Sequence, residues 1–347
     1  MFFLSRLFAF TSFTVVAASA AGQTSETPDP LFQDNDRLDV TITAPLTTLV
    51  RKRPKDDYLD GVLQYTEADG TTVDLDLEIR TRGHFRHATC DYPPILLNLK
   101  KNQTNETLFD KQNKLKLVIP CESSERYEQI VLREYLAYRI LNTVTNMSFR
   151  VRLLRVTYVN TEKDGGGQVR YGFLIEHKNR LAERYDLKDL EIPRTTVAAI
   201  KPDRLNLTSI FEFLIGNTDF SPIAGHPDDE CCHNYVLFGN NVDPIIAIPY
   251  DFDQSGFVDA PYAIPNEQLH IRSVRQRVYR GRCVNNKYVE NSLQKFRDNR
   301  AAIYAVIEEQ EGLDSRVRKS LVRYVDDFYE LINDAKDVEN RIIDRCS

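Results

Sequence analysis

The sequence lacks long apolar runs, an excess of positive charge, CxxC pairs and internal repeats. Beyond the leader no segment reaches about 18 consecutive apolar residues, the length that a membrane-spanning helix needs, so we expect no transmembrane segment in the mature chain. The formal net charge is −6, and we therefore expect no nucleic-acid partner. The absence of CxxC pairs and repeats argues against common zinc sites and repeat architectures.

The chain begins with a leader that is typical of export. Arg6 precedes a mostly apolar stretch, and Ala18-Ser19-Ala20 forms a small-x-small cleavage site. This pattern predicts a signal peptide over 1–20 and an exported protein, which would be periplasmic, secreted or on the cell surface. Residues 21–36 are polar, contain proline and show no periodicity, so we expect a flexible tether there.

An even number of cysteines in an exported protein favours disulfide bonds over metal sites. The six are Cys90, Cys121, Cys231, Cys232, Cys283 and Cys346. Cys90 and Cys121 lie at the edges of expected strands in the first half of the chain, and we expect them to pair. We expect Cys283 to pair with Cys231 or Cys232, and the sequence leaves both choices open.

Hydrophobic periodicity changes near the middle of the chain. Short β-rich segments, several of them alternating, predict an antiparallel sheet, and they lie at 38–43, 62–66, 73–80, 95–100, 115–119, 150–158 and 170–176. Residues 124–145 instead repeat apolar side chains every three or four positions, as in an amphipathic helix. Helical patterns follow at 205–215, 286–311 and 314–344. We therefore predict a two-lobed α+β fold, with a β-rich lobe over 37–176 containing one helix and a mostly helical lobe over 177–347.

Acidic and amide side chains flank a predicted hairpin in the second half. Two β-branched runs, 235–238 and 245–248, enclose a turn-rich hexapeptide, so Asn234 lies at the entrance and Asp251 and Asp253 lie at the exit. Oxygen ligands gathered in this way suit Mg²⁺, which binds one or two carboxylates and completes its shell with phosphates and water. The alternative is a surface loop whose acidic residues cap turns.

Six segments in a fixed order resemble the CotH-type (spore coat protein H-like) atypical protein kinases. They are Arg80-Thr-Arg-Gly83, Leu132-Arg-Glu-Tyr-Leu-Ala-Tyr138, Tyr171-Gly-Phe-Leu-Ile-Glu176, Ile215-Gly-Asn-Thr-Asp219, His233-Asn234 and Pro249-Tyr-Asp-Phe-Asp253. The resemblance implies a two-lobed protein-kinase-like fold that uses ATP with Mg²⁺ or Mn²⁺. It also implies transfer of the γ-phosphate to a Ser or Thr hydroxyl of an exported or envelope protein.

The resemblance assigns roles to four residues. Asp219 matches the catalytic aspartate that accepts the proton of the attacking hydroxyl, while Asn234 and Asp251 match the metal ligands. Asp253 replaces a glycine of the ordinary kinase triplet and would add a carboxylate. Asp219 could instead be a turn residue at a helix end, and the neighbouring His233 could either orient a carboxylate or be structural.

Phosphoryl transfer also needs a cation on the nucleotide phosphates and a carboxylate that orients the cation. Lys116 on a strand and Glu134 on the following helix are the candidates, although a solvated strand face explains the lysine equally well. The strand after the glycine segment, 93–98, lacks the lysines usual in the family, which leaves the choice of lysine open.

The segment that would cover the phosphates contains one glycine, Gly83, instead of three. Arg82 and Arg86 could therefore contact phosphate directly, or they could be surface charges. Glu176, at the expected junction of the lobes, would lie where adenine is held, or in an ordinary strand-end turn. Two other functions stay open: a binding or envelope-assembly protein without turnover, and an enzyme that transfers AMP.

Overall fold

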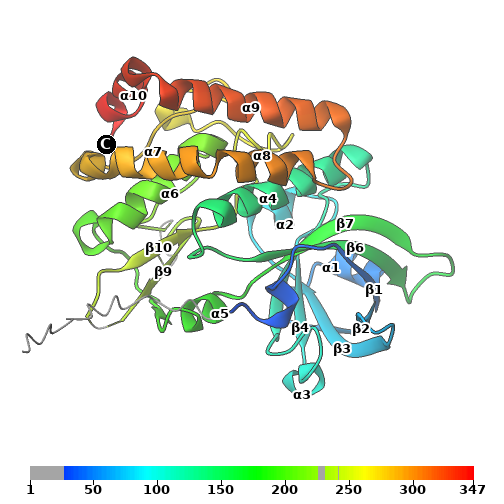
Figure 1. The fold of residues 1–347 in the computed structure, drawn as a ribbon. Helices are drawn as coiled ribbons and strands as arrows, with labels where there is room; N and C mark the ends of the chain where they lie inside the picture. The colour runs from blue at the N-terminus through cyan, green and yellow to red at the C-terminus, as the bar shows by residue number, and fades with distance from the viewer. Residues whose placement is uncertain (1–26, 226–230, 241) are drawn as a thin grey trace, which may run out of the picture.

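The protein is described by a computed structural model that covers residues 27–225, 231–240 and 242–347. Its first half forms a closed seven-stranded barrel in the order β1-β2-β3-β4-β5-β7-β6 (Figure 1). The strands are β1 (Leu38–Ala44), β2 (Leu59–Thr66), β3 (Thr72–Thr81), β4 (Ile95–Leu99), β5 (Lys114–Val118), β6 (Val151–Asn160) and β7 (Gln168–Ile175). Short helices connect them: α1 (Leu46–Lys52), α2 (Phe85–Thr89) and α3 (Lys101–Thr104).

Alternating side chains fill the barrel interior. Ile42, Leu63, Leu77, Leu97 and Leu115 come from five different strands, and all are at most 2% exposed. Side chains of neighbouring residues on a strand point to opposite faces, so the period-2 pattern gives each strand an apolar inner face. Burial of these side chains stabilises the closed sheet.

The predicted two-lobed kinase-like fold is wrong. β1 pairs in parallel with β6, from Leu38 opposite Leu154 to Ala44 opposite Asn160, and this pairing closes the sheet into a mixed barrel. The helical half packs directly on the barrel, because Phe173 of β7 and Phe328 near the chain end belong to the same cluster of buried side chains, while the barrel interior has a core of its own. Strand alternation identifies strands but does not specify pairing between segments more than a hundred residues apart, so closure was not predicted.

The helix predicted over 124–145 is α4 (Glu125–Val144). It lies between the barrel and the later helices (Figure 1). Polar residues Glu128, Gln129 and Glu134 are buried along with its apolar positions, so α4 is enclosed on more sides than an amphipathic surface helix. The later helices are α5 (Lys178–Glu183), α6 (Pro202–Ile215), α7 (Val289–Asp298), α8 (Arg300–Glu308), α9 (Ser315–Asn333) and α10 (Ala335–Arg341).

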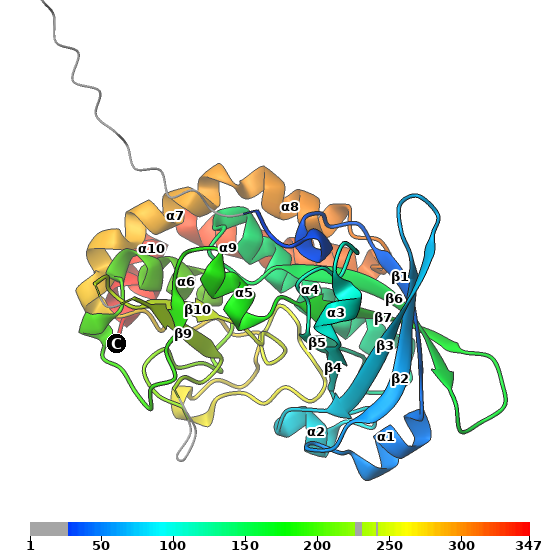
Figure 2. The same cartoon turned by 90° about the horizontal axis from the view of Figure 1, so that it is seen from below.

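A second, smaller sheet contains the predicted hairpin. Its order is β10-β9-β8, with β8 (Lys188–Asp189), β9 (Tyr235–Gly239) and β10 (Ile246–Pro249). β9 and β10 are antiparallel, with Tyr235 opposite Pro249. Figure 2 shows this hairpin beside α6, well away from β2 and β3. Short 3₁₀ helices occupy Pro30–Phe32, Val197–Ala199, Glu267–Leu269, Cys283–Tyr288 and Ile343–Arg345.

The cysteines form three disulfides, and one of the two predicted pairings is confirmed. Cys90 bonds to Cys121 as expected. Cys283 bonds to Cys346, while Cys231 bonds to its neighbour Cys232, so the prediction for Cys283 is wrong. The chain end returns to the Cys283 segment, where Ser347 accepts a backbone hydrogen bond from Cys283 and donates one to Gly281. No local sequence pattern predicted this return.

Part of the segment expected to be a tether packs on the barrel. Leu31 and Phe32 are 0% and 4% exposed and belong to the barrel core. The Asp29 carboxylate binds the Arg180 guanidinium through two hydrogen bonds of 2.7 Å. The tether prediction therefore does not hold for residues 29–32. The predicted signal peptide over 1–20 and the first part of the tether lie outside the described residues.

Two further sequence expectations concern boundaries and membranes. The division expected after Glu176 falls directly behind β7, where the barrel ends. Within the part of the chain that the structure describes, none of the helices combines the length and apolar character needed to cross a membrane.

Candidate active site

The two ends of the β9–β10 hairpin bring Asn234 next to Asp251. The backbone N–H of Tyr250 donates to the carbonyl oxygen of Asn234 at 3.0 Å. Asn234 and Asp251 both have positive φ angles, 56° and 63°, a region that Asn and Asp tolerate better than most residues. Sparsely populated backbone conformations are common at functional sites, so this end of the hairpin is a candidate site.

Asp219 lies against the same hairpin end. It follows α6, whose C-cap Gly216 has a φ of 64°, and its backbone N–H donates to the side-chain oxygen of Asn217 at 2.9 Å. The Asn234 side-chain amide donates to the carbonyl oxygen of Asp219 at 2.7 Å and to its carboxylate at 3.1 Å. The helix end, the turn and the hairpin together position a carboxylate that is still 43% exposed.

His233 fixes the second oxygen of that carboxylate. Its Nε2 atom lies 2.7 Å from Asp219 Oδ1. This hydrogen bond raises the pKa of His233, although partial burial opposes the shift. The contact matches the carboxylate-orienting role considered for His233. With Asn234 on one oxygen and His233 on the other, the Asp219 side chain has a fixed direction.

Asp251 has an unpaired carboxylate at the centre of the charged groups. Its backbone N–H donates to the Tyr138 hydroxyl on α4 at 2.8 Å, while its carboxylate oxygens accept no hydrogen bond from the described residues. Its charge acts on Lys116, Arg82 and Asp253. Burial, followed by the Asp251 charge, raises the pKa of Asp253 to about 7.

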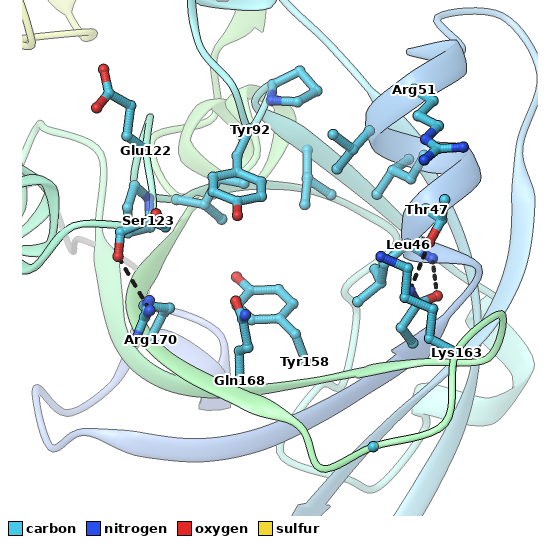
Figure 3. Close-up of a pocket in the computed structure, with 18 of the residues that line it drawn as sticks. Leu46, Thr47, Arg51, Tyr92, Glu122, Ser123, Tyr158, Lys163, Gln168 and Arg170 are labelled. Carbon is cyan, nitrogen blue, oxygen red and sulfur yellow. Dashed lines mark hydrogen bonds between the residues drawn. The ribbon is translucent and has the colours of Figure 1, made fainter.

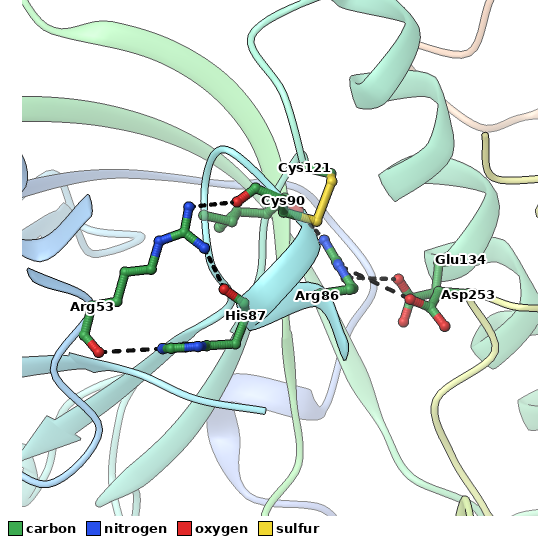
Figure 4. The surroundings of a disulfide bond; sticks show 8 residues. Arg53, Arg86, His87, Cys90, Cys121, Glu134 and Asp253 are labelled. Atoms are coloured by element: carbon green, nitrogen blue, oxygen red, sulfur yellow. Dashed lines mark hydrogen bonds and ion pairs between the residues drawn. A yellow bond between two sulfur atoms is a disulfide. The ribbon is translucent and has the colours of Figure 1, made fainter. Parts of the chain in front are cut away.

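Asp253 and Glu134 share a single arginine. Arg86 Nη1 lies 3.6 Å from Glu134 Oε2, and Arg86 Nε lies 4.0 Å from Asp253 Oδ2. Burial, followed by the Asp253 charge, raises the pKa of Glu134. In Figure 4 Arg86 extends from α2, beside the Cys90–Cys121 disulfide, toward both carboxylates. The expected pairing of Glu134 with Lys116 is therefore replaced by a pairing with Arg86, and Asp253 faces this arginine.

Lys116 lies at a separate pocket next to Asp251. Its Nζ atom is 4.6 Å from the centre of the Tyr250 ring, the residue before Asp251. The pocket has a volume of about 360 Å³ and is also lined by Lys114, Glu176 and His177. Although the Lys116 side chain reaches solvent, the surrounding protein and then the Arg82 charge lower its pKa to about 8.

Arg82 and Gly83, which were predicted to contact phosphate, differ in their surroundings. Arg82 donates from Nε to the carbonyl oxygen of Ile95 at 3.2 Å, and burial lowers its pKa while Asp251 opposes that shift. Gly83 is exposed and has a φ of 80°, which suits a sharp turn after β3. Neither residue lines the Lys116 pocket, although the Arg82 charge acts on Lys116.

The Glu176 side chain is occupied by other protein groups. Arg184 donates to both of its carboxylate oxygens at 2.9 Å, and the backbone N–H of Arg150 donates at 3.1 Å. Glu176 is 3% exposed. It therefore lines the pocket, but its carboxylate forms a structural ion pair, which does not match the predicted contact with adenine.

Sequence reasoning missed two groups at this site. Tyr138 belongs to the expected helix and to one of the six motifs but had no role of its own in the prediction, yet its hydroxyl accepts a hydrogen bond from the backbone N–H of Asp251. Glu212 is 1% exposed in α6, and burial raises its pKa to about 8. A lone glutamate within the apolar run 205–215 was the available signal for this buried group.

The oxygen atoms available at the site fit part of a Mg²⁺ shell. The described residues include no group of three or more His, Cys, Asp or Glu side chains that could hold a metal ion. Asp251 and the amide oxygen of Asn234 nevertheless supply the hard ligands that Mg²⁺ takes in small number beside phosphates and water. These two residues would supply only part of the shell of such an ion.

Comparison of the sequence with protein-family models and with curated proteins found no match. The resemblance to CotH-type kinases therefore depends on the motif residues alone.

Proposed function

We propose that the chain transfers the γ-phosphoryl group of ATP, with Mg²⁺ or Mn²⁺, to a Ser or Thr hydroxyl of another protein. One observation carries the proposal: the Lys116 pocket is lined by Tyr250, the residue directly before Asp251, whose carboxylate accepts no hydrogen bond from the described residues. A pocket of nucleotide size, a cation and an available carboxylate are the groups that phosphoryl transfer needs close together.

The proposed roles follow from position and charge. The nucleotide base occupies the pocket, and Lys116 binds the phosphates that extend toward Asp251. Asp251 and Asn234 supply oxygen ligands to the divalent ion, which neutralises the charge of the phosphates when it is bound. Arg82, which lies near Asp251 and Lys116, adds a second positive charge on the phosphate side.

Asp219 accepts the proton of the attacking hydroxyl. The hydroxyl oxygen bonds to the γ-phosphorus, the bond from that phosphorus to the β–γ bridging oxygen breaks, and ADP leaves. The hydrogen bonds from Asn234 and His233 keep the Asp219 carboxylate directed at the hydroxyl. The buried cluster of Arg86, Glu134 and Asp253 holds α2, α4 and the hairpin exit together behind these groups.

Export is part of the proposal. Three disulfides are typical of oxidising compartments, and the leader predicts secretion. The protein substrate would then be an exported or envelope protein.

The experiment uses purified full-length protein with Mg²⁺ or Mn²⁺, dephosphorylated casein as an acceptor, and ATP labelled at either the α or the γ phosphate. We expect γ label, and no α label, on the casein or on the chain itself. Transfer of α label would contradict the proposal and indicate AMP transfer. Absence of both labels would contradict an enzymatic role and favour the binding or assembly role.

Nucleotide binding should depend on the charge of Lys116. The lowered pKa, about 8, means that the ammonium group loses its proton as the pH rises above that value, while a solvated lysine stays charged. The affinity for Mg²⁺-ATP should therefore fall above this pH, by at most about 10-fold per pH unit, and calorimetric titrations across the range measure it. In Lys116→Met affinity should be lower and nearly independent of pH; an equal pH dependence in this variant would contradict the assignment.

A further inference from the structure

A second pocket lies at the barrel mouth, away from the candidate active site. Its volume is about 440 Å³, within the range of small-molecule sites, which barrel mouths often contain. Its walls are formed by α1, the start of β4, the segment after β5 and the β6–β7 hairpin. Leu46, Leu49, Ile95 and Ile119 make much of this wall apolar.

Two tyrosine hydroxyls face this pocket. Figure 3 shows Tyr92 and Tyr158 pointing their hydroxyls toward one another across the pocket, with Gln168 beside Tyr158. The Tyr158 hydroxyl is buried and has no hydrogen-bond partner among the described residues. A buried unpaired hydroxyl is unfavourable, and Tyr158 and the exposed Gln168 both line the pocket, so a ligand oxygen there would supply the missing acceptor.

Positive charge is in excess next to the pocket, where Arg170 is part of the lining while Glu128 and Arg155 lie outside it. Arg155 and Arg170 both bind the single carboxylate of Glu128, at 3.1 and 3.4 Å. Two guanidinium groups and one carboxylate leave a net charge of about one unit. Arg170 is held further by its bond to the carbonyl oxygen of Ser123 at 3.2 Å, so this charge is preorganised at the pocket edge (Figure 3).

The remaining charged groups of the lining do not cancel this excess. Arg51 and Lys163 form no ion pair with the described residues. Glu122, on the Arg170 side, forms a hydrogen bond with the Tyr127 side chain. Burial, followed by this hydrogen bond, raises the pKa of Tyr127. Asp164 lies in the exposed β6–β7 turn. The lining therefore favours an anionic ligand.

We propose that this pocket binds a small apolar carboxylate. Its aromatic or branched body fills the space against α1 and the barrel mouth. Its carboxylate accepts hydrogen bonds from Tyr158 and Tyr92 and lies next to Arg170. This site is independent of the proposed phosphoryl transfer, because the residues that line the two pockets do not overlap.

The test is calorimetric titration of the full chain with naphthoate near neutral pH, with uncharged naphthamide as the matched ligand. We expect one-site binding of naphthoate and binding of naphthamide weaker by about 10-fold, because a hydrogen bond to a charged group is stronger than one to a neutral group. Tyr158→Phe and Arg170→Met should each weaken naphthoate binding by about 10-fold. Tyr158→Phe should leave the melting temperature unchanged or higher, because it removes an unpaired hydroxyl.

Lys116→Met is the control for binding at the other pocket and should leave naphthoate affinity unchanged. Each of four results would overturn the proposal: no saturable binding at millimolar naphthoate, equal affinity for naphthamide, unchanged affinity in both Tyr158→Phe and Arg170→Met, or loss of binding in Lys116→Met.

Discussion

Replacing Asp251 with asparagine should lower the rate of γ-phosphoryl transfer by about 10³-fold, because loss of one preorganised charged group at a reaction centre has effects of this order. The substitution removes the negative charge that acts on Lys116 and a hard ligand for the divalent ion. Asparagine keeps the volume of the side chain and tolerates the φ of 63° at this position. The fold should therefore be unchanged, and initial rates of label transfer measure the effect.

Asp243→Asn is the matched control for Asp251→Asn. Asp243 lies in the turn at the opposite end of the same hairpin, is exposed, and accepts a hydrogen bond from Asn240 at 2.8 Å. Its replacement makes the same chemical change away from the site and should leave the rate unchanged. If Asp251→Asn retained more than about a tenth of the rate, Asp251 would not have the central role proposed for it.

Replacing Arg184 with methionine should destabilise the fold by about 3–5 kcal/mol, the usual effect of removing one partner from a buried ion pair. Arg184 and Glu176 are 5% and 3% exposed. The variant leaves the Glu176 carboxylate buried, and among the described residues only the backbone N–H of Arg150 still donates a hydrogen bond to it. Urea unfolding measures the change in the free energy of unfolding.

The pH dependence of the Arg184→Met variant follows from the pKa of Glu176. Burial already raises this pKa, and the Arg184 charge opposes the shift, so removing Arg184 raises it further. Protonation at lower pH removes the unpaired charge, and the stability lost in the variant should therefore become smaller as the pH falls. A deficit that grew toward acid pH would contradict this explanation.

Two further variants separate the ion pair from simple loss of side-chain packing. Lys100→Met removes an exposed pair with Asp76, 54% and 62% exposed, and should change stability by less than about 1 kcal/mol. The double variant Arg184→Met, Glu176→Leu removes both charges and should recover much of the stability. Equal destabilisation by the single and double variants would show that packing, and not the unpaired charge, is responsible.

The local sequence pattern was sufficient to predict the β9–β10 hairpin and α4. The β-branched runs around the 239–244 turn predicted β9 and β10, and the pairing of Tyr235 with Pro249 brings Asn234 to Asp251. The contact of Asn234 with Asp219 joins two segments that the sequence analysis placed in one site. The chemical roles of these residues stay predictions.

Pairing between strands and between side chains far apart in the chain could not be predicted from the sequence. Ile42 lies opposite Tyr158 in the parallel pair that closes the barrel, and no local period specifies that partner. The sequence analysis paired Glu134 with Lys116, a lysine on a nearby strand. In the structure Glu134 pairs with Arg86 instead, and this ion pair joins α2 to α4. Buried charges such as Glu176 find partners through tertiary packing, which a single sequence does not encode locally.

The most direct measurement of the central claim is calorimetric titration of the full chain with ATP, with and without Mg²⁺. The proposed site predicts saturable binding that strengthens when Mg²⁺ is present and loses this dependence in Asp251→Asn, because the oxygens of Asp251 and Asn234 bind the ion together with the phosphates. Absence of ATP binding, or equal binding with and without Mg²⁺, would contradict a shared nucleotide and metal site at the end of the hairpin.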